Sequence, residues 1–463
     1  MSTTVEFPQS LILTPAQETQ LRHLWSLVAA AQRSVTLHLH LRAAGHEFPL
    51  VEVVDAALGG RGGSLPALPG PDDRVTRPVH HVDELLSEFR RIRDARGWST
   101  LVPAEAFEAV IRETCAAFRT LPPHPRFGDL PATWPVSQPL RLSLGSSVHL
   151  IDPLSIEVAP LRDHARVLAD AYLLPAPFWA ALQRDQEVQL DRIAGRLKRL
   201  DAAWLDSGDV DAAAQALQLR ARYAGRGLHR RTPHTLLDGN LPRKCTRVLI
   251  REAVRPGLPT RFEVVWTFDV QGLALKPPRS GDTIGIDPGE RHVYAWATVT
   301  DGGVVPRPFH GLWRIQTPTL DGDPPTCRGP HDFAFARAHQ RWQLFQRLQP
   351  VYEGMLERCF SYRTVALEDT DFAGLHAKGR PFAAYAETVG LTAALQWIVQ
   401  LAPLHDVEIR LVPPEYSSRT CSRCWLRSRR PRPGEPFVCA TCGHAEDSDV
   451  NAARVHRGRA LQR

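Results

Sequence analysis

The sequence has no long hydrophobic segment, and no 18 apolar residues follow one another anywhere in its 463 residues. Because a helix needs about 20 such residues to cross a bilayer, the composition predicts no membrane partner. The first ten residues, MSTTVEFPQS, lack the basic and then apolar pattern of a secretory signal. We therefore expect a cytoplasmic protein.

Cysteine is also scarce, with eight residues in the chain. Four of these are scattered without regular spacing, and we expect free thiols in a reducing compartment: Cys115, Cys245, Cys327 and Cys359. The other four form two pairs, Cys421-x2-Cys424 and Cys439-x2-Cys442, separated by fourteen residues. This spacing predicts a zinc site. Four thiolates complete the tetrahedron, so the metal should stabilise the fold rather than catalyse a reaction.

Positive charge is concentrated in one segment. From Arg220 to Arg255 there are ten basic and two acidic residues, a balance of +8, whereas the whole chain carries +6. Such a concentration indicates a polyanionic partner, and the alternative is a solvated basic face. The predicted nucleic-acid contacts in this segment are Arg226, Arg230, Arg231, Arg243, Lys244 and Arg247.

A second basic group lies between the two cysteine pairs, beside Trp425. We expect this group to hold a phosphate backbone, unless it is only a charged, solvated loop. Its members are Arg427, Arg429, Arg430 and Arg432.

In the N-terminal half, helical and strand patterns alternate. The segment Thr14-Pro15-Ala16-Gln17 has an N-cap residue, a proline and a glutamine in the order that begins a helix, which we expect to run to about Arg42. Further helices are predicted at 82–96 and 103–119, with loops at 59–78 and 121–139. Period-two patterns predict strands at 140–158, 246–251 and 261–270, and a helical pattern occupies about 160–222. We therefore expect a small β-domain with a helical insertion.

From residue 282 onward the pattern is α/β. Two strands are predicted at 283–287 and 293–299, and a hairpin turn at 301–303 leads to a third. A helix at 332–359, a strand at 365–368, a helix at 382–403 and a strand at 407–412 follow, and a last helix begins near Asp449. Three meandering strands and then helix–strand–helix–strand is the ribonuclease H-like order.

Three acidic residues occupy the ends of these elements. Asp287 and Glu368 end their strands, and Asp449 opens the last helix. Carboxylates at the ends of adjacent strands can share a pocket, where they repel one another unless cations lie between them. Oxygen ligands of this kind suit Mg²⁺ or Mn²⁺. Two such ions about 4 Å apart can activate a water and stabilise the leaving oxygen of a phosphodiester, so the set predicts metal-dependent hydrolysis of a nucleic-acid strand.

Each of these acids, taken singly, could have a purely structural role. An aspartate at a strand end is usually a turn former, and Asp449 could be an N-cap. Four neighbouring acids could substitute for the three: Asp369, Asp371, Glu446 and Asp447. Of these, Asp447 is the hardest to exclude. His229, His234 and His292 have no ligand-like spacing, so we treat them as bystanders.

Several motifs together resemble one family. They are GIDPG at 285–289, ALED at 366–369, PPEYSSRTCSRC at 413–424, Cys439-x2-Cys442-Gly443 and Asp449-x-Asn451-Ala452-Ala453. This set resembles the TnpB family of transposon-encoded RNA-guided nucleases and their descendants, the compact type V CRISPR effectors. The resemblance covers roughly 282–463 and is weak before that. The chain departs from the family pattern at Trp425, where glycine is common, at Pro288, and in its large helical insertion.

The resemblance implies a multidomain α+β fold. Residues 1–135 would form an N-terminal segment and helical recognition lobe, and 136–281 a wedge-like β-barrel domain with the insertion at about 160–222. Residues 282–420 and 443–463 would form a RuvC-type nuclease domain, with a zinc ribbon at 421–442 inserted in it. Asp287, Glu368 and Asp449 would occupy the three catalytic, magnesium-binding positions.

The resemblance also implies a function. Family members bind a guide RNA and cut DNA that matches it, beside a short motif read by the protein, while base pairing reads the remaining sequence. We therefore expect an RNA-guided DNA endonuclease of the prokaryotic cytoplasm, associated with the nucleoid when on target, acting as a monomer or a homodimer on one RNA. Two alternatives stay open: an RNA-guided repressor that cleaves little, and a guide-free transposase or junction resolvase.

Overall fold

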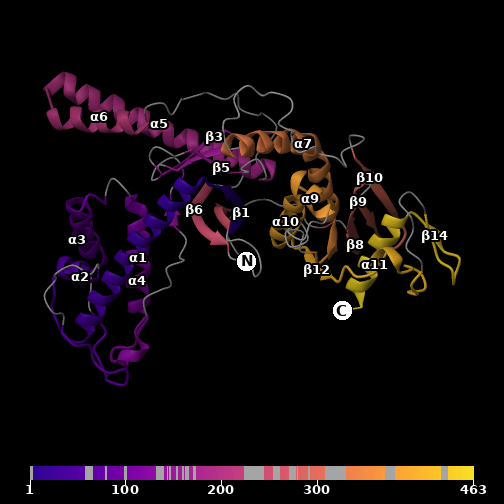
Figure 1. Cartoon of the computed structure of the whole chain (residues 1–463), viewed down its shortest axis with the longest axis horizontal. Helices are drawn as coiled ribbons and strands as arrows, with labels where there is room; N and C mark the ends of the chain where they lie inside the picture. The colour runs from indigo at the N-terminus through magenta and orange to yellow at the C-terminus, as the bar shows by residue number, and fades with distance from the viewer. Residues whose placement is uncertain are drawn as a thin grey trace.

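The computed structural model describes most of the chain. The described residues are 4–57, 66–78, 81–98, 102–131, 140–142, 144, 147–152, 155–158, 161, 166–169, 174–223, 244–253, 261–270, 278, 280–289, 292–307, 330–370, 381–428 and 436–462. A bundle of N-terminal helices and a C-terminal sheet lie at opposite ends of the molecule, with a second sheet between them (Figure 1). No helix in these ranges is long and apolar enough to cross a membrane.

The N-terminal bundle is built on helix α1 (Pro15–Ala43). The predicted capping box is present, because Thr14 Oγ1 accepts from the Gln17 backbone N–H and Gln17 Oε1 accepts from the Thr14 backbone N–H. The other helices of the bundle are α2 (Leu50–Ala57), α3 (Val82–Ala95) and α4 (Ala104–Arg119), and a short 3-10 turn, η2 (Phe127–Asp129), follows. The rings of Phe89, Trp98 and Phe107 pack against one another in its core.

The central sheet has the strand order β2-β6-β7-β1-β5-β4-β3. Its strands are β1 (Thr4–Ile12), β2 (Leu140–Leu142), β3 (Val148–Asp152), β4 (Ser155–Val158), β5 (Arg166–Ala169), β6 (Lys244–Ala253) and β7 (Arg261–Asp269). Strand β1 runs antiparallel to β7 along almost its whole length, with Thr4 opposite Asp269. Strand β1 was not predicted from the sequence, although it lies in the middle of the sheet.

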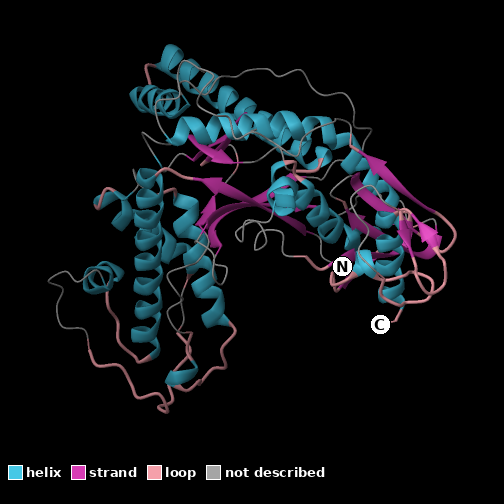
Figure 2. Ribbon diagram, turned by 45° about the vertical axis from the view of Figure 1, so that its right-hand side comes forward, coloured by secondary structure: helices cyan, strands magenta, loops and turns pink. Residues whose placement is uncertain are grey.

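Two helices leave the central sheet as a long hairpin, α5 (Ala176–Ser207) and α6 (Val210–Tyr223) (Figure 2). The predicted helical segment of about 160–222 was therefore wrong in its first part, which contains strand β5. That strand is only four residues long and is held by pairing with β1 and β4, which sequence periodicity does not report.

The C-terminal sheet has the order β10-β9-β8-β11-β12. Its strands are β8 (Ser280–Pro288), β9 (His292–Ala297), β10 (Gly302–Pro306), β11 (Tyr362–Glu368) and β12 (Glu408–Val412). The first three are antiparallel neighbours, whereas β8, β11 and β12 run parallel. Strands and helices follow one another here in the order that the sequence predicts.

The helices that accompany this sheet within the described residues are α7 (Pro330–Cys359), α9 (Pro381–Thr388), α10 (Leu391–Leu401) and α11 (Ser448–Leu461). The single helix predicted at 382–403 is in fact two, because Gly390 adopts a left-handed conformation with φ of 76° between α9 and α10. The remaining short elements are η5 (Ala402–His405), η6 (Ser417–Arg419), β13 (Phe437–Val438) and β14 (Ala445–Glu446).

Helix α11 lies very close to strand β8. A Cβ atom built on Gly285 would stand 2.0 Å from the Ala453 carbonyl oxygen and 2.9 Å from the Arg457 nitrogen. Only glycine allows the backbones of helix and strand to approach in this way. The Arg457 guanidinium adds a hydrogen bond of 3.0 Å to the Thr283 carbonyl on the same strand. The position of α11 against β8 is therefore closely determined.

Candidate functional site

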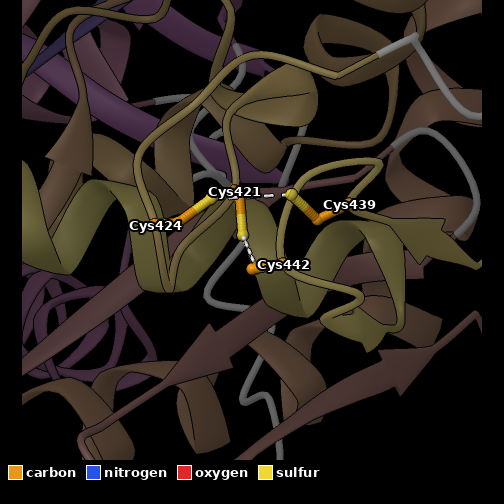
Figure 3. A group of neighbouring side chains, drawn as sticks. All are labelled: Cys421, Cys424, Cys439 and Cys442. Atoms are coloured by element: carbon orange, nitrogen blue, oxygen red, sulfur yellow. Dashed lines mark hydrogen bonds between the residues drawn. The ribbon is translucent and has the colours of Figure 1, made fainter.

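The four cysteines of the two CxxC pairs converge on one point (Figure 3). The sulfur atoms of Cys421 and Cys442 are 3.7 Å apart, and those of Cys424 and Cys439 are 3.6 Å apart. A tetrahedral zinc ion with Zn–S bonds of about 2.3 Å requires sulfur separations of about 3.8 Å. The arrangement therefore fits a structural zinc ion held by four thiolates.

The two halves of this zinc knuckle have matching backbones. Trp425 donates its N–H to the Cys421 carbonyl at 2.9 Å, and Gly443 donates in the same way to Cys439 at 3.1 Å. Both residues are left-handed, with φ of 63° at Trp425 and 68° at Gly443. A non-glycine residue pays about 1–2 kcal/mol for this conformation, so the tryptophan needs a compensating contact.

That contact is with helix α11. A Cβ atom built on Gly458 would stand 2.3 Å from Cζ2 of the Trp425 indole, so the ring lies directly on the helix backbone at this glycine. Asn451, which is fully buried, accepts from the Ser422 backbone N–H at 3.0 Å and donates to the Thr420 carbonyl at 2.8 Å. The zinc knuckle is thus fixed to the helix that carries Asp449.

Replacing Gly458 by alanine should disturb this junction. The new methyl group would collide with the Trp425 indole, and we expect the free energy of unfolding to fall by about 1–3 kcal/mol. The matched control is Gly354→Ala, because Gly354 is an exposed helical glycine with nothing within 4 Å of its built Cβ. Alanine there should raise stability by about 0.5–1 kcal/mol. Chemical denaturation of both variants measures the difference, and equal responses would contradict the contact.

The second cluster lies where β8 and β11 end. These strands are parallel neighbours, and Leu367 pairs with Ile286, so the next residue of each, Glu368 and Asp287, emerges at the same edge of the sheet. His456 of α11 joins them. Its Nε2 is 3.0 Å from Asp287 Oδ1 and 3.7 Å from Glu368 Oε2, and one ligand atom from each of the three residues lies within 4.8 Å of the others.

Asp287 is electrostatically perturbed. Burial raises the pKa of its carboxyl group to about 6, and the hydrogen bond with His456 opposes this effect. The negative charges of Glu368 and Asp449 are smaller contributions to the same increase in pKa. The carboxylates are therefore close enough to repel one another, which is the condition that a bound cation would relieve.

Asp449 belongs to a neighbouring group. One ligand atom each from His292, Asp447 and Asp449 lies within 4.8 Å of the others, and His292 Nε2 is 3.8 Å from Asp449 Oδ2. No sequence pattern indicates this contact and we treated His292 as a bystander, but β9 carries it to the acid at the start of α11. His229 and His234 lie outside the described residues.

The N-cap of α11 is Asp447, since its Oδ1 accepts from the backbone N–H groups of Asp449 and Val450 at 2.8 and 3.3 Å. The side chain of Asp449 is therefore not consumed as the cap. Glu446 is engaged by Arg454 at 2.9 Å. Asp369 follows β11 and donates its backbone N–H to the Val412 carbonyl, and Asp371 lies outside the described residues.

Most of the basic residues predicted to contact nucleic acid lie outside the described residues. Arg247 donates to Glu6 at 2.9 Å, and the Arg427 guanidinium lies 3.8 Å from the centre of the Tyr416 ring. Lys244 begins β6. The others lie outside the described residues: Arg226, Arg230, Arg231, Arg243, Arg429, Arg430 and Arg432.

Sequence reasoning missed His456 entirely. One signal could have indicated it: His456 follows Asp449 by seven residues, and residues seven apart share a helix face. Of the thiols expected to be free, Cys115, Cys245 and Cys359 form no disulfide, and Cys327 lies outside the described residues.

Together, the fold and these side chains define a protein in which a four-cysteine knuckle packs on helix α11, and the same helix borders a carboxylate-rich edge of a mixed sheet. Residues 394–456 match the family model of the Cas12f1-like TNB domain. The matched segment contains the four cysteines and most of α11, the part of the chain in which the motifs resemble the TnpB family and the compact type V effectors.

Two solved structures are also similar to the chain. One is described as the cryo-EM structure of the Cas12f1-sgRNA-target DNA complex; it is 12% identical, with 98% of this chain and 99% of that chain covered and a TM-score of 0.28. The other, a cryo-EM structure of a CRISPR-Cas12f ternary complex, is 11% identical, with coverages of 95% and 81% and a TM-score of 0.29. Both TM-scores are too low to show a shared fold. No curated protein is significantly similar to this chain in sequence.

Proposed function

We propose that this protein is an RNA-guided DNA endonuclease whose C-terminal sheet is a RuvC-like nuclease domain. The observation that carries the proposal is the emergence of Asp287 and Glu368 side by side from parallel strands β8 and β11, with α11 bringing Asp449 close enough to raise the pKa of Asp287. Strand order and helix positions agree with a ribonuclease H-like domain.

The donor set supports Mg²⁺ or Mn²⁺ as cofactor. Asp287, Glu368 and Asp449 would supply hard oxygen ligands, and Asp287 is buried enough that its ionised form needs a positive partner. When bound, such ions would activate a water and stabilise the leaving oxygen of the phosphodiester. Helix α11 would hold the carboxylates in place, because it carries Asp449 and places His456 3.0 Å from Asp287.

The knuckle would hold Zn²⁺ and keep α11 in position. Asn451 attaches the knuckle to the helix turn that bears Asp449, and Trp425 attaches it to Gly458, near the other end of α11. Arg427 beside Tyr416 offers a cation and an aromatic face at the rim of the knuckle, a pairing suited to nucleic-acid strands.

For partners we propose a guide RNA and a target DNA, as in the compact type V effectors that the motifs resemble. The N-terminal helices would form the recognition lobe, and the central sheet with its α5–α6 hairpin the wedge-like domain. The basic residues of 220–255 would contact the RNA scaffold.

One experiment separates this proposal from its alternatives. The purified protein is tested for copurified RNA, and the complex is then incubated with guide-matched duplex DNA and Mg²⁺. Cleavage that requires both RNA and metal supports the proposal. Tight guided binding without products would indicate a repressor, and activity on branched or transposon-end DNA after removal of all RNA would indicate a guide-free enzyme.

Asp287→Asn should abolish guided cleavage, by about 10³-fold or more, because the substitution removes a charge from the metal-binding set while keeping its shape. Guided DNA binding should be unchanged. Asp282→Ala is the matched control, since Asp282 is an exposed acid on the same strand. Gel analysis of products measures both variants, and cleavage by Asp287→Asn at the wild-type rate would exclude this site.

A further inference from the structure

We propose that His456 is a positioning residue of the nuclease site, whose Nε2–H donates to Asp287 Oδ1 and fixes the paired carboxylates of Asp287 and Glu368. The inference rests on the proposed function and adds to it a residue outside the three acids. The hydrogen bond measures 3.0 Å, and His456 is fully buried.

The placement follows from the helix. Asp449 stands in the first turn of α11 and His456 two turns later, so both point from the same face. Asp449 approaches His292 of β9, whereas His456 approaches the acids of β8 and β11. One helix therefore supplies an acid of the site and also the group that orients the other two.

His456 can contact Asp287 because helix α11 lies very close to strand β8 at Gly285. The helix backbone at Ala453 and Arg457 would stand within 3 Å of a Cβ on this strand residue, which lies two positions before Asp287. Because the flanking helix residues are in backbone contact with β8, the imidazole between them has little freedom to move relative to Asp287.

The surroundings of Nδ1, the other ring nitrogen of His456, indicate that Nε2 donates a hydrogen bond and does not bind a metal directly. His456 Nδ1 is buried and has no hydrogen-bond partner among the described residues. If Nε2 bound a cation, the ring proton would lie on Nδ1 and a buried N–H would be left unsatisfied, whereas metal-binding histidines almost always donate through their other nitrogen. With the proton on Nε2, the donor is satisfied by Asp287 and Nδ1 exposes only a lone pair.

The Glu368 carboxylate has a polar group beside each of its two oxygen atoms. Its Oε1 accepts from the Thr370 hydroxyl, and its Oε2 faces His456 Nε2 at 3.7 Å, beyond hydrogen-bond range. The electropositive N–H edge therefore lies between two carboxylates that would otherwise repel each other. Loss of this edge should let the carboxylates separate and weaken the cation site that they form.

The test compares three variants of the full-length protein in complex with its copurified RNA. His456→Leu removes the donor and keeps the bulk, and His456→Gln restores an amide donor. His405→Leu is the control, because the His405 ring stacks at 4.2 Å on Phe360, which precedes the start of β11, whereas Glu368 ends that strand. The readouts are Mn²⁺ binding, measured by electron paramagnetic resonance, the ¹⁴N couplings of the bound Mn²⁺, and the kcat and KM of guided cleavage.

We expect His456→Leu to weaken Mn²⁺ binding and to lower kcat by roughly 10–100-fold each, with KM for DNA unchanged. His456→Gln should recover most of both losses, and His405→Leu should match the wild type. Wild-type Mn²⁺ should show no directly coordinated imidazole nitrogen of His456.

Three results would overturn the inference: wild-type Mn²⁺ affinity and kcat in His456→Leu, a ¹⁴N coupling that His456→Gln abolishes, or no recovery by a folded His456→Gln. The Mn²⁺ readouts do not depend on cleavage. A wild-type complex that binds Mn²⁺ through these residues but cuts no guided target would therefore refute the proposed function and leave the positioning role standing.

Discussion

Gly285→Ala should be among the most damaging single-methyl changes in this protein. The methyl carbon would stand 2.0 Å from the Ala453 carbonyl oxygen, and neither the strand nor the helix backbone can yield without losing its own hydrogen bonds. We expect the free energy of unfolding to fall by about 3 kcal/mol or more. Guided cleavage should fall by about 100-fold even in folded molecules, since shifts of about 1 Å misplace reacting groups by that factor.

Gly281→Ala provides the matched control. Gly281 belongs to the same strand, β8, but nothing lies within 4 Å of its built Cβ, so alanine there should be neutral or slightly stabilising. Thermal unfolding and cleavage rates of the two variants test the prediction. If Gly285→Ala behaves like Gly281→Ala, then α11 does not approach β8 as closely as the structure shows.

Replacement of one zinc-binding cysteine is the second substitution that should strongly reduce stability and cleavage. Cys421 is fully buried at the centre of the knuckle, and structural zinc sites contribute about 10 kcal/mol or more of apparent binding free energy. We expect Cys421→Ser to lose its zinc, to unfold the knuckle and to reduce guided cleavage by about 100-fold, because Asn451 and Trp425 then no longer hold α11.

Cys359→Ala is the control for this change, since Cys359 is a fully buried thiol of α7 outside the quartet. Mass spectrometry of metal content should find one zinc ion per chain in the control and in the wild type, and none in Cys421→Ser. Full zinc occupancy or unchanged cleavage in Cys421→Ser would contradict a structural role for the knuckle.

The sequence predicts elements whose signals are local. Helix α1 is preceded by a complete capping box at Thr14, and the cysteine spacing alone indicates the knuckle. Strand β1 escaped prediction for the opposite reason. It contains Pro8, which lacks a backbone N–H and therefore argues against a central strand. In the structure Pro8 nevertheless lies opposite Val265 of β7.

The residues of the candidate site also differ in whether a local sequence signal identifies them. Asp287 and Glu368 could be identified because each ends an apolar strand, and the parallel pairing of β8 with β11 brings them together. The spacing of His456 from Asp449 indicates a shared helix face, but the contacts of His292 and His456 with the acids could not be predicted, because they depend on how closely α11 packs on the sheet. The close approach requires a glycine at 285, and this requirement becomes visible only when strand and helix are in contact.

The register of β1 also affects how the chain is made. Thr4 pairs with Asp269, so β1 leaves the ribosome long before β7, the strand on which most of its pairing depends. At 5–20 residues per second, β7 follows only after roughly tens of seconds. Until then the side chains of Val5, Phe7 and Leu11, which are buried in the finished sheet, have no β7 to pack beside. We therefore expect synthesis of this protein to pass through a nascent stage in which its first strand is exposed to aggregation.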